Sequence, residues 1–237
     1  MSKDNIYADD GRPVDAFRFN QEVVDVFEDM ISRSVPHYID NLEELVALSL
    51  DAYQAGTRIY DLGCSKGALA LPLALAIRQL NGEVIAVDNA PAMIAALKAK
   101  TGTLPIRGQC QTIQETSIEN ASVVILNYVL QFIPREERIN VLERIHNGLT
   151  PGGILLLSEK ICHPDPTLNQ VYIDRHHSFK KANGYSLLEI SRKRQALEDV
   201  LVPETLNAHL ERLRAVGFTV ADVWDQHYNW VSIYCRK

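Results

Sequence analysis

Hydrophobic residues recur at helical spacing in the first part of the chain. From Phe19 to Val35, "FNQEVVDVFEDMISRSV" returns an apolar side chain every three or four positions, which predicts an amphipathic helix. The next segment, "IDNLEELVALSLDAY" at 39–53, predicts a second helix with Asn41 as its N-cap. We expect these two helices to form an N-terminal helical layer over residues 1–55.

Beyond this layer, strand patterns alternate with helical patterns. The strand-like runs are "TRIYDLG", "GEVIAVDN", "PIRGQCQTI", "ASVVILNYVL" and "GGILLLSEK", and the segments between them include "ALALPLALAIRQL", "APAMIAALKAK" and "REERINVLERIHNGL", which read as helices. The runs at 121–130 and 152–160 are almost continuously apolar, as strands buried on both faces of a sheet are. This alternation predicts a parallel sheet with helices on both sides.

The last part of the chain has a different pattern. Residues 159–203 have a mostly helical pattern with many charged residues, and we interpret them as an insertion that shapes a substrate pocket. A helix that ends at Gly217 follows, and then two strand-like runs, 219–226 and 229–237, that form a hairpin. The predicted fold class is therefore α/β: one domain over 1–237 with a doubly wound, mostly parallel seven-stranded sheet, a C-terminal antiparallel hairpin and N-terminal helices.

Composition narrows the class of protein. The 237 residues are 46% hydrophobic and 23% charged, which suits a folded domain with a sizeable core. A net charge of -6 argues against tight nonspecific nucleic-acid binding, and the longest apolar run, 68–77, is too short to span a membrane. The four cysteines are scattered, and no secretory signal is visible at the start. We therefore expect a cytoplasmic protein with reduced thiols.

A loop of small residues follows the first predicted strand. In "YDLGCSKG" the loop carries Asp61, Gly63, Ser65 and Gly67, a spacing that differs from the GxGxxG of dinucleotide-binding folds. Small residues let the backbone approach a ligand closely. Asp61 suits a cationic amino-acid head group and would repel a pyrophosphate. This pattern is typical of class I S-adenosylmethionine-dependent enzymes, although an ordinary tight turn would also produce it.

Other polar residues lie at the ends of later strands, where ligands bind in open α/β sheets. Asp88 ends the second strand, where an acid can accept hydrogen bonds from ribose hydroxyls, and Asn89 follows it on the adenine side. Either residue could instead cap the next helix. Asn127 ends an apolar strand, where an amide without a partner would be costly. Glu159 and Lys160 end the fifth strand and could simply pair with each other.

At this point the chain resembles one family, the carboxy-S-adenosyl-L-methionine synthases, from about Phe19 to its end. The resemblance rests on "MISRSVPHY", "YDLGCSKGA", "DNAPAMI", "IENASVVILNYVLQF", "GLTPGGILLLSEK", "HHSFKKANGYSLLEISRKR" and "VGFT". It implies an enzyme that converts S-adenosylmethionine and prephenate to carboxy-S-adenosylmethionine and phenylpyruvate. That product serves the formation of oxyacetylated uridine at the tRNA wobble position. The resemblance also implies a homodimer.

The resemblance implies a set of ligand contacts as well. The family's contacts fall on Tyr38, Gly63, Cys64, Ser65, Asp88, Asn89, Asn127 and Arg194. Arg194 would hold the new carboxylate, since a guanidinium matches a carboxylate in geometry and charge. One position departs from the family: an Asp-Ile pair beside adenine is replaced here by Thr112 and Ile113. Thr112 can still make one hydrogen bond to adenine.

Two other functions share the same fold. An ordinary methyltransferase acting on tRNA or a small molecule would have the same loop and Asp88, but it needs no cation near the methyl group. A catalytically silent binding protein is the second alternative. Among the cations at 192–194 we assign only Arg194 to the ligand; Arg192 and Lys193 are expected on a solvated face, with Glu189 paired to Lys193.

A basic segment precedes these cations. "HHSFKK" at 176–181 places two adjacent histidines beside Lys180 and Lys181. Adjacent histidines face different ways and no third ligand is in view, so we predict no metal site. The lysines are expected near the prephenate-facing side of the pocket, where cations would favour a dianion. RNA binding is not required by any of these residues.

Overall fold

The computed structural model describes residues 2–9, 11 and 13–237. In these residues, seven strands form one sheet in the order β3-β2-β1-β4-β5-β8-β7, and a short strand, β6 (Glu204–Thr205), pairs with β5 outside that path. The strands are β1 (Arg58–Leu62), β2 (Glu83–Asp88), β3 (Ile106–Cys110), β4 (Ala121–Asn127), β5 (Leu149–Cys162), β7 (Val220–His227) and β8 (Trp230–Arg236). The helices are α1 (Gln21–Ser34), α2 (Tyr38–Ala52), α3 (Ala70–Ile77), α4 (Pro91–Thr101), α5 (Arg138–Gly148), α6 (Pro166–Ala182), α7 (Leu187–Leu197) and α8 (Leu206–Val216), with short 3-10 turns at Leu130–Phe132 and Arg135–Glu137.

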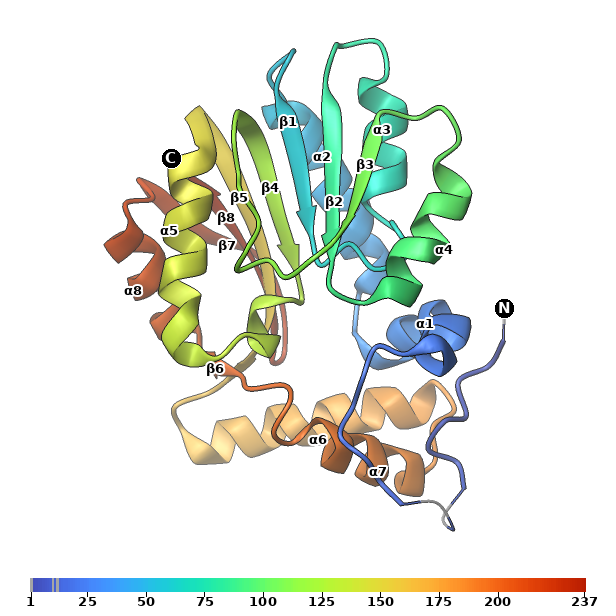
Figure 1. The fold of residues 1–237 in the computed structure, drawn as a ribbon. Coiled ribbons are helices and arrows are strands. Elements are labelled where there is room, and N and C mark those ends of the chain that lie inside the picture. The colour runs from blue at the N-terminus through green and yellow to red at the C-terminus, as the bar shows by residue number, and fades with distance from the viewer. Residues whose placement is uncertain (1, 10, 12) are drawn as a thin grey trace.

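The sheet separates two layers of helices (Figure 1). One apolar core lies between the sheet and α5 and α8, with Leu142 and Leu213 fully buried. A second core lies on the other face, where Leu45 of α2, Leu73 of α3 and Leu97 of α4 are fully buried. Because β1, β4 and β5 are covered on both faces, their sequences are almost continuously apolar. These layers confirm the doubly wound α/β fold predicted from the sequence.

The parallel strands β1 to β5 are followed in the sheet by the C-terminal hairpin. β8 runs antiparallel to β5, and β7 runs antiparallel to β8. α8 ends at Gly217, which adopts φ +113°, a left-handed conformation that favours glycine at a helix C-terminus. The register places Trp230, the first residue of β8, opposite Lys160 near the carboxyl end of β5. The predicted antiparallel hairpin is therefore confirmed, and it brings an aromatic side chain to the ligand edge of the sheet.

The N-terminal helices begin differently from each other. Asn20 caps α1, because its side chain accepts a hydrogen bond from the backbone of Val23. The predicted N-cap of α2 is wrong: the helix already begins at Tyr38, and Asn41 lies inside it, 3% exposed. The sequence pattern misplaced the start because the polar Asn41 faces the sheet and has its partners there.

The remaining helices lie across the carboxyl ends of the parallel strands. Figure 1 shows α6 and α7 side by side below the strand ends, with α1 and the N-terminal segment beside them. α6 begins at Pro166 behind an Asp165 cap, and α7 begins with a capping box between Ser186 and Glu189. The charged segment after β5 thus forms a helical cover over the edge of the sheet where open α/β folds bind ligands.

Candidate active site

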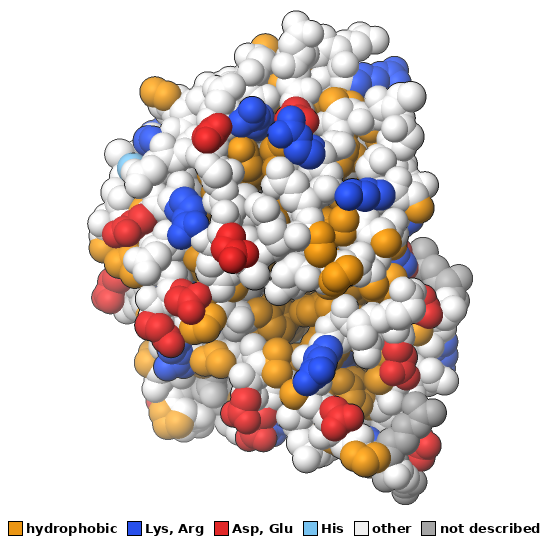
Figure 2. Space-filling model, in the orientation of Figure 1, with side chains coloured by type: hydrophobic (Ala, Val, Ile, Leu, Met, Phe, Trp, Pro, Cys, Tyr) orange, Lys and Arg blue, Asp and Glu red, His pale blue; other side chains and the backbone are white. Residues whose placement is uncertain are grey.

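A cavity of about 390 Å³ lies between the carboxyl ends of the strands and the cover made by α1, α6 and α7. Hydrophobic side chains gather across the middle of the face seen in Figure 2, below the sheet. The volume is within the range of small-molecule sites. Eight of the ten residues predicted to bind the ligand line this cavity: Tyr38, Gly63, Cys64, Ser65, Asp88, Asn89, Ile113 and Asn127. The other two, Thr112 and Arg194, do not.

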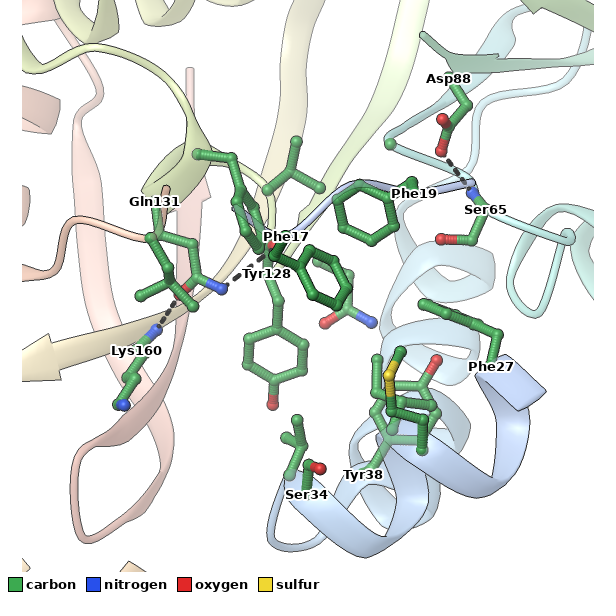
Figure 3. A pocket seen from close by; sticks show the side chains of 18 of the residues that line it. Phe17, Phe19, Phe27, Ser34, Tyr38, Ser65, Asp88, Tyr128, Gln131 and Lys160 are labelled. Carbon is green, nitrogen blue, oxygen red and sulfur yellow. Dashed lines mark hydrogen bonds between the residues drawn. The ribbon is translucent and has the colours of Figure 1, made fainter. Parts of the chain in front are cut away.

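The loop after β1 has the close backbone approach that its small residues predict. Gly63 adopts φ +80°, and a Cβ built on it would lie 2.3 Å from the Cγ2 atom of Val129. Ser65 also has a positive φ, +47°, which is uncommon for a residue with a side chain. Its backbone N–H donates to Asp88 Oδ2 at 2.9 Å, which ties the loop to the end of β2 (Figure 3). The loop is therefore held in a fixed shape before any ligand binds.

Asp61 is buried at the end of β1, 2% exposed, and lines the cavity. Its Oδ2 accepts one hydrogen bond, from the backbone N–H of Ala70 at 3.1 Å, at the start of α3. Burial raises the pKa of Asp61 to about 7, and the nearby Asp88 adds to the rise, although the Ala70 hydrogen bond opposes it. A buried carboxyl with so little compensation favours a cationic group in the cavity.

Asp88 is held by two backbone hydrogen bonds and does not cap α4, whose N-cap is Ala90 without a side-chain cap hydrogen bond. Its Oδ1 accepts from the backbone N–H of Ala90 at 2.9 Å, beside the first turn of α4, and its Oδ2 accepts from Ser65. Burial raises the pKa of Asp88, although these two backbone hydrogen bonds favour the charged form. The side chain is fixed by the backbone and still lines the cavity, where each carboxylate oxygen can accept a further hydrogen bond.

Asn127 is held by a relay of buried polar groups. The amide nitrogen of Asn41 donates to Asn127 Oδ1 at 3.1 Å, and Ser232 Oγ donates to Asn41 Oδ1 at 2.7 Å. Ser158 Oγ lies 2.9 Å from Ser232 Oγ. The relay therefore connects α2, β4, β5 and β8. The amide nitrogen of Asn127 makes no hydrogen bond to the described residues, so it can donate to a ligand in the cavity.

Aromatic and apolar side chains form the walls between the polar groups. Tyr38 and Tyr128 line the cavity, and burial raises the pKa of both phenols, so they stay neutral. Tyr128 packs edge-on against Trp230, with ring centroids 5.2 Å apart. Ile113 is buried and faces the cavity, whereas the hydroxyl of Thr112 donates to Glu115 Oε2 at 2.7 Å. The apolar member of the predicted adenine pair thus reaches the cavity and the polar member does not.

Three lysines gather at the other side of the cavity from Asp88. Lys160 comes from β5, Lys180 from α6 and Lys193 from α7, and all three line the cavity. Figure 3 shows Lys160 across the cavity from Asp88 and Ser65, with Tyr128 and Phe17 between them. Burial, and after it the neighbouring cations, lowers the pKa of Lys180 to about 7. Burial also lowers the pKa values of Lys160 and Lys193 to about 8. One side of the cavity is acidic and the other is cationic.

The segment at 192–194 differs from its prediction. Lys193, expected on a solvated face, is 6% exposed, and its Nζ donates to Ser34 Oγ at 3.0 Å. Glu189, its expected partner, instead accepts hydrogen bonds from Ser186 in the capping box. Arg194 is the exposed residue, while Arg192 is half-buried. Helical spacing placed the wrong residue of the segment toward the cavity.

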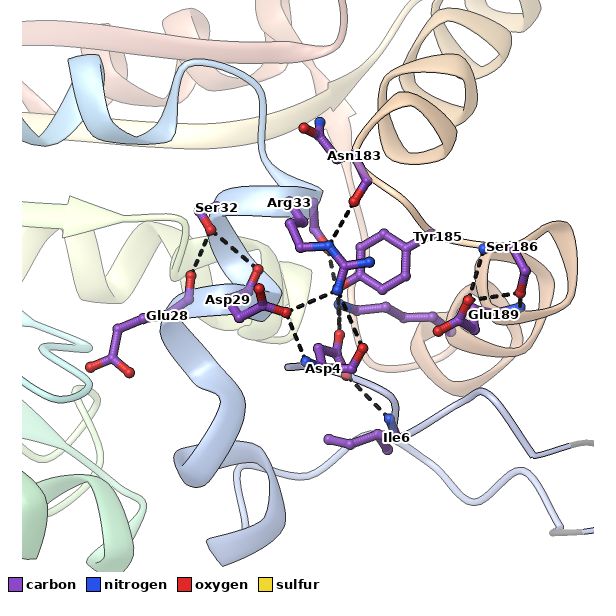
Figure 4. A network of polar contacts seen from close by, with 12 residues as sticks. Asp4, Ile6, Glu28, Asp29, Ser32, Arg33, Asn183, Tyr185, Ser186 and Glu189 are labelled. Carbon is purple, nitrogen blue, oxygen red and sulfur yellow. Dashed lines mark hydrogen bonds and ion pairs between the residues drawn. The ribbon is translucent and has the colours of Figure 1, made fainter. Parts of the chain in front are cut away.

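The N-terminal segment supplies the carboxylate that Lys193 contacts. Asp4 is 1% exposed, and its Oδ2 lies 3.7 Å from Lys193 Nζ and accepts a hydrogen bond from the hydroxyl of Tyr185. Figure 4 shows Asp4 between α1 and the loop that joins α6 to α7. Arg33 of α1 donates to the carbonyl of Asp4 at 3.3 Å and, through Nε, to that of Asn183 at 2.7 Å. These contacts hold the three helices of the cover together.

Glu159 and Lys160 do not pair with each other. Glu159 is fully buried and accepts from the backbone N–H of Leu130 at 2.8 Å, while the backbone N–H of Lys160 donates to Gln131 Oε1 at 2.8 Å. Burial raises the pKa of Glu159 to about 8, with the charge of Arg138 opposing the rise. Neighbours on a strand point to opposite sides, so Glu159 faces the protein interior and Lys160 faces the cavity.

Sequence reasoning also missed parts of the cavity wall. Phe17 and Phe19 precede the first predicted helix, and their rings lie edge-to-face at 5.0 Å. Both line the cavity, as does Trp230. A pattern at 17–19 that alternates aromatic and polar residues could have indicated the first two. The pairing of β8 with β5 could have indicated Trp230, because it puts the start of β8 at the ligand edge.

We also searched the described residues for metal-binding groups and membrane-spanning helices. Among the residues that the structure describes, no three His, Cys, Asp or Glu side chains are grouped so that they could hold a metal ion. His176 is buried, and its Nε2 lies 2.8 Å from the carbonyl oxygen of Ser34. Within residues 2–9, 11 and 13–237, no helix combines the length and the apolar character that crossing a membrane requires. All four cysteines are free thiols.

Comparisons with known proteins found a matching family model and similar proteins of nearly the same length. A family model described as a methyltransferase domain matches residues 59–153, which include the loop after β1 and Asp88. The chain is 50% identical over 239 aligned residues to a carboxy-S-adenosyl-L-methionine synthase of Geobacter metallireducens, covering 99% of this chain and 98% of the relative. It is 44% identical to the enzyme of that name from Actinobacillus succinogenes, with full coverage of both chains.

Solved structures share the fold at low sequence identity. Magnesium protoporphyrin IX methyltransferase from Synechocystis PCC 6803 with bound SAH superposes with a TM-score of 0.61 at 15% identity, covering 98% of this chain and 91% of that one. Human N-acetylserotonin methyltransferase in complex with SAM superposes with a TM-score of 0.58 at 18% identity, covering 91% of this chain and 55% of the other. These likenesses concern the fold alone.

Proposed function

The chain belongs to the carboxy-S-adenosyl-L-methionine synthase family, and from this premise we propose that its carboxyl donor is prephenate and that its product serves wobble-uridine modification in tRNA. The protein is an enzyme of the transferase class with S-adenosylmethionine as a substrate. One observation carries the proposal: a single cavity has Asp61 and Asp88 at one side and three lysines at the other. The acidic side suits adenosylmethionine, and the cationic side suits an anionic second substrate.

We place S-adenosylmethionine with its parts distributed along the strand ends. The α-ammonium group lies against Asp61, and the ribose hydroxyls donate to Asp88. The adenine ring packs on Ile113, with Asn89 beside it. Asn127 and the backbone of the Gly63–Ser65 loop bind the amino-acid part, because this loop brings its N–H groups close to the ligand. Tyr38 and Cys64 complete the wall around it. The sulfonium then faces the centre of the cavity.

The reaction balances without a metal or a redox partner. The sulfonium acidifies its methyl group, and loss of one methyl proton gives an ylide. Prephenate loses its ring carboxylate as CO2 and its ring hydroxyl as hydroxide, which leaves phenylpyruvate. The ylide carbon bonds to CO2, and the methyl proton leaves with the hydroxide as water. A largely apolar cavity favours this sequence because it limits the access of bulk water to the ylide and to CO2.

Arg194 is proposed to hold the new carboxylate. Its side chain is exposed on α7, outside the cavity of its own chain. Its charge nevertheless acts on the cationic side of the cavity: burial, and after it the charge of Arg194, lowers the pKa of Lys160. We propose that the enzyme is a homodimer in which α7 is covered, so that Arg194 reaches a cavity at the subunit interface. Thr112 donates to Glu115 and is assigned no more than a supporting place beside adenine.

A dimer with a shared cavity can be tested by mixing subunits. An Arg194→Ala chain and an Asp88→Ala chain are each expected to be inactive alone. If Arg194 serves the partner's cavity, a mixture assembled from both regains activity, because one of its two sites keeps both residues. If mixing restores nothing while the dimer still forms, Arg194 serves the cavity of its own chain.

The enzyme itself is proposed to act on small molecules in the cytoplasm. The carboxylated product, rather than this protein, would meet tRNA, so no direct nucleic-acid binding is required. Four free thiols are compatible with a reducing compartment. We propose that residues 1–237 form one functional unit, with residues 1–55 and 159–203 closing the cavity over the sheet.

The mass of the ligand that copurifies with the protein tests the proposal. The protein is purified without added ligand and denatured, and the released small molecules are weighed by mass spectrometry. We expect a species heavier than S-adenosylmethionine by one CO2. Release of only S-adenosylmethionine or S-adenosylhomocysteine, together with no carboxylated product when prephenate is added, would contradict it and favour an ordinary methyltransferase.

A further inference from the structure

The ammonium group of Lys180 is buried without a partner. The residue is 8% exposed on α6 and lines the cavity. Among the described residues, its Nζ has no hydrogen bond or ion pair. A buried cation of this kind is costly unless an anion reaches it. Burial, and after it the charges of Lys193 and Lys160, lowers the pKa of Lys180 to about 7, although the charge of Asp4 opposes this shift. The Lys180 side chain is therefore partly neutral when the cavity is empty, and a bound anion would favour its charged form.

The two neighbouring lysines have few partners of their own. The Nζ of Lys160 lies 5.7 Å from the ring centroid of Trp230, a cation–π contact that leaves its hydrogen-bond donors unused. Lys193 has Asp4 at 3.7 Å, which is the single ion pair that these three lysines make within the described residues. Arg33, close by, is already paired with Asp29 at 2.9 Å. Lys160 and Lys180 therefore make no ion pair within the described residues, and the charge of Asp4 acts on Lys180 without direct contact.

An apolar wall adjoins these charges. Trp230 is 7% exposed, Tyr128 packs edge-on against it, and the ring of His176 also lies edge-to-face to it at 5.3 Å. Flat apolar surfaces beside donors suit an unsaturated ring that carries carboxylates. His176 stays neutral, because burial and then the charge of Lys180 hold its pKa well below the ordinary value.

We propose that Lys160, Lys180 and Lys193, with the Trp230 ring, form a binding subsite for a cyclic dicarboxylate, the second substrate of the reaction. This inference rests on the proposed function and assigns residues to it. Lys180 and Lys160, which make no ion pair within the described residues, bind the two carboxylates in their charged forms. Lys193 is fixed by Asp4 and Ser34 and completes the positive field.

The subsite also explains how the product leaves. Loss of the ring carboxylate turns a dianion into phenylpyruvate, which has one carboxylate. One of the two free ammonium groups then loses its partner, so the subsite binds the product more weakly than the substrate. The same difference makes the lysines selective for dianions over monoanions in the first binding step.

Binding without turnover tests the subsite. The protein is loaded with S-adenosylhomocysteine, which lacks the reacting methyl group, and prephenate or phenylpyruvate is titrated in by calorimetry. We expect prephenate to bind at least about tenfold more tightly than phenylpyruvate. Lys180→Met is expected to weaken prephenate binding roughly 10- to 100-fold, because charged hydrogen bonds contribute that much. Its affinity for S-adenosylhomocysteine should change less than about twofold.

Two variants control the result. Lys181→Met removes a cation from the exposed neighbour on α6 and should leave prephenate affinity unchanged. Lys180→Arg keeps the charge and should restore part of the affinity. Lys180→Met should also raise the thermal midpoint of the ligand-free protein, since it removes an unpaired buried charge, and this outcome shows that the variant folds. Prephenate affinity that is equal in wild type and a folded Lys180→Met protein would overturn the subsite.

The two levels of the proposal fail in different ways. If prephenate binds through Lys180 but no carboxylated product forms with S-adenosylmethionine, the subsite is correct and the proposed reaction is wrong. If carboxylated product forms and its prephenate KM is the same in Lys180→Met as in wild type, the reaction is correct and the subsite is wrong.

Discussion

Replacing Arg138 by methionine should lower the free energy of unfolding by more than the loss of an exposed ion pair does. Arg138 begins α5 and is 0% exposed. Its guanidinium donates to the carbonyls of Ile133 at 2.9 Å and Val202 at 2.8 Å, and it pairs with Glu204. It therefore joins the segment after β4, which lines the cavity, to the chain that leaves α7.

The size of the effect follows from what Arg138→Met leaves behind. Breaking a buried ion pair from one side costs about 3–5 kcal/mol, because the remaining groups lose their partner in a dry environment. Glu204 keeps Arg212, whose Nη2 lies 2.7 Å from Glu204 Oε1, so we expect the lower end of this range, about 3 kcal/mol. The carbonyls of Ile133 and Val202 lose their side-chain donor, which keeps the cost from falling much further.

Urea unfolding followed by circular dichroism measures this change. With a slope of about 3 kcal/mol per molar for a chain of this size, the midpoint should fall by roughly 1 M. The matched control is Arg107→Met, because Arg107 makes a two-point pair with Glu83 at 3.0 and 2.9 Å but has a side chain 56% exposed. Its cost should stay below about 1 kcal/mol.

The pH dependence supplies a second readout. Burial opposes ionisation of Glu204, but Arg212 and Arg138 outweigh it and hold the pKa of that carboxyl below its ordinary value. The resulting stability is present above the unfolded value of about 4.3 and is lost as the pH falls through the folded pKa. The difference between wild type and Arg138→Met should therefore shrink below about pH 4.3. Equal midpoints for Arg138→Met and Arg107→Met at pH 7 would refute this reasoning.

Three further predictions concern the ligand site. Affinity for S-adenosylmethionine should fall as the pH drops below about 7, since burial raises the pKa of Asp61 to that value and the protonated acid cannot pair with an ammonium group. Calorimetry at several pH values should show proton release on binding, and Asp61→Asn should bind weakly at every pH. A flat wild-type profile from pH 5.5 to 8 would argue against the contact. Asn41→Ala removes the donor that holds Asn127 and should weaken S-adenosylmethionine binding roughly 5- to 10-fold, a loss of about 1 kcal/mol. The control Asn147→Ala, at an exposed position, should leave the affinity unchanged. Equal dissociation constants for the two variants would show that the relay does not position Asn127. Arg194→Ala should lose the preference for carboxy-S-adenosylmethionine over S-adenosylmethionine while the exposed Arg175→Ala keeps it, as competition binding would measure, and a preference that survives in Arg194→Ala would move the carboxylate contact to another residue.

The sheet and its helices were predictable because their signal is local. Apolar runs such as 121–127 form strands buried on both faces, and helical spacing in 21–34 directs one side of α1 inward. The loop after β1 was predictable for a similar reason, since glycine at Gly63 answers a close approach that no larger residue could make. In each case the residue type itself reports the local environment.

The cationic side of the cavity was harder to predict because its causes are remote in the sequence. Lys193 looked like an exposed partner of Glu189 at helical spacing. In the structure Glu189 accepts hydrogen bonds from Ser186 in the capping box. Lys193 is buried and pairs with Asp4, from the far end of the chain. Asn41 was misread for the same reason, because its partners are on β4 and β8. Polar residues buried by distant partners have no periodic signal.

The origin of the transferred carboxyl group tests the proposed reaction most directly. The protein is incubated with S-adenosylmethionine and prephenate that carries carbon-13 in its ring carboxylate, with unlabelled bicarbonate in the buffer, and both products are weighed. We predict carboxy-S-adenosylmethionine with the label in its new carboxylate and an equal amount of unlabelled phenylpyruvate. Unlabelled carboxy-S-adenosylmethionine, or S-adenosylhomocysteine with no carboxylated product, would contradict transfer of the prephenate carboxyl group in this cavity.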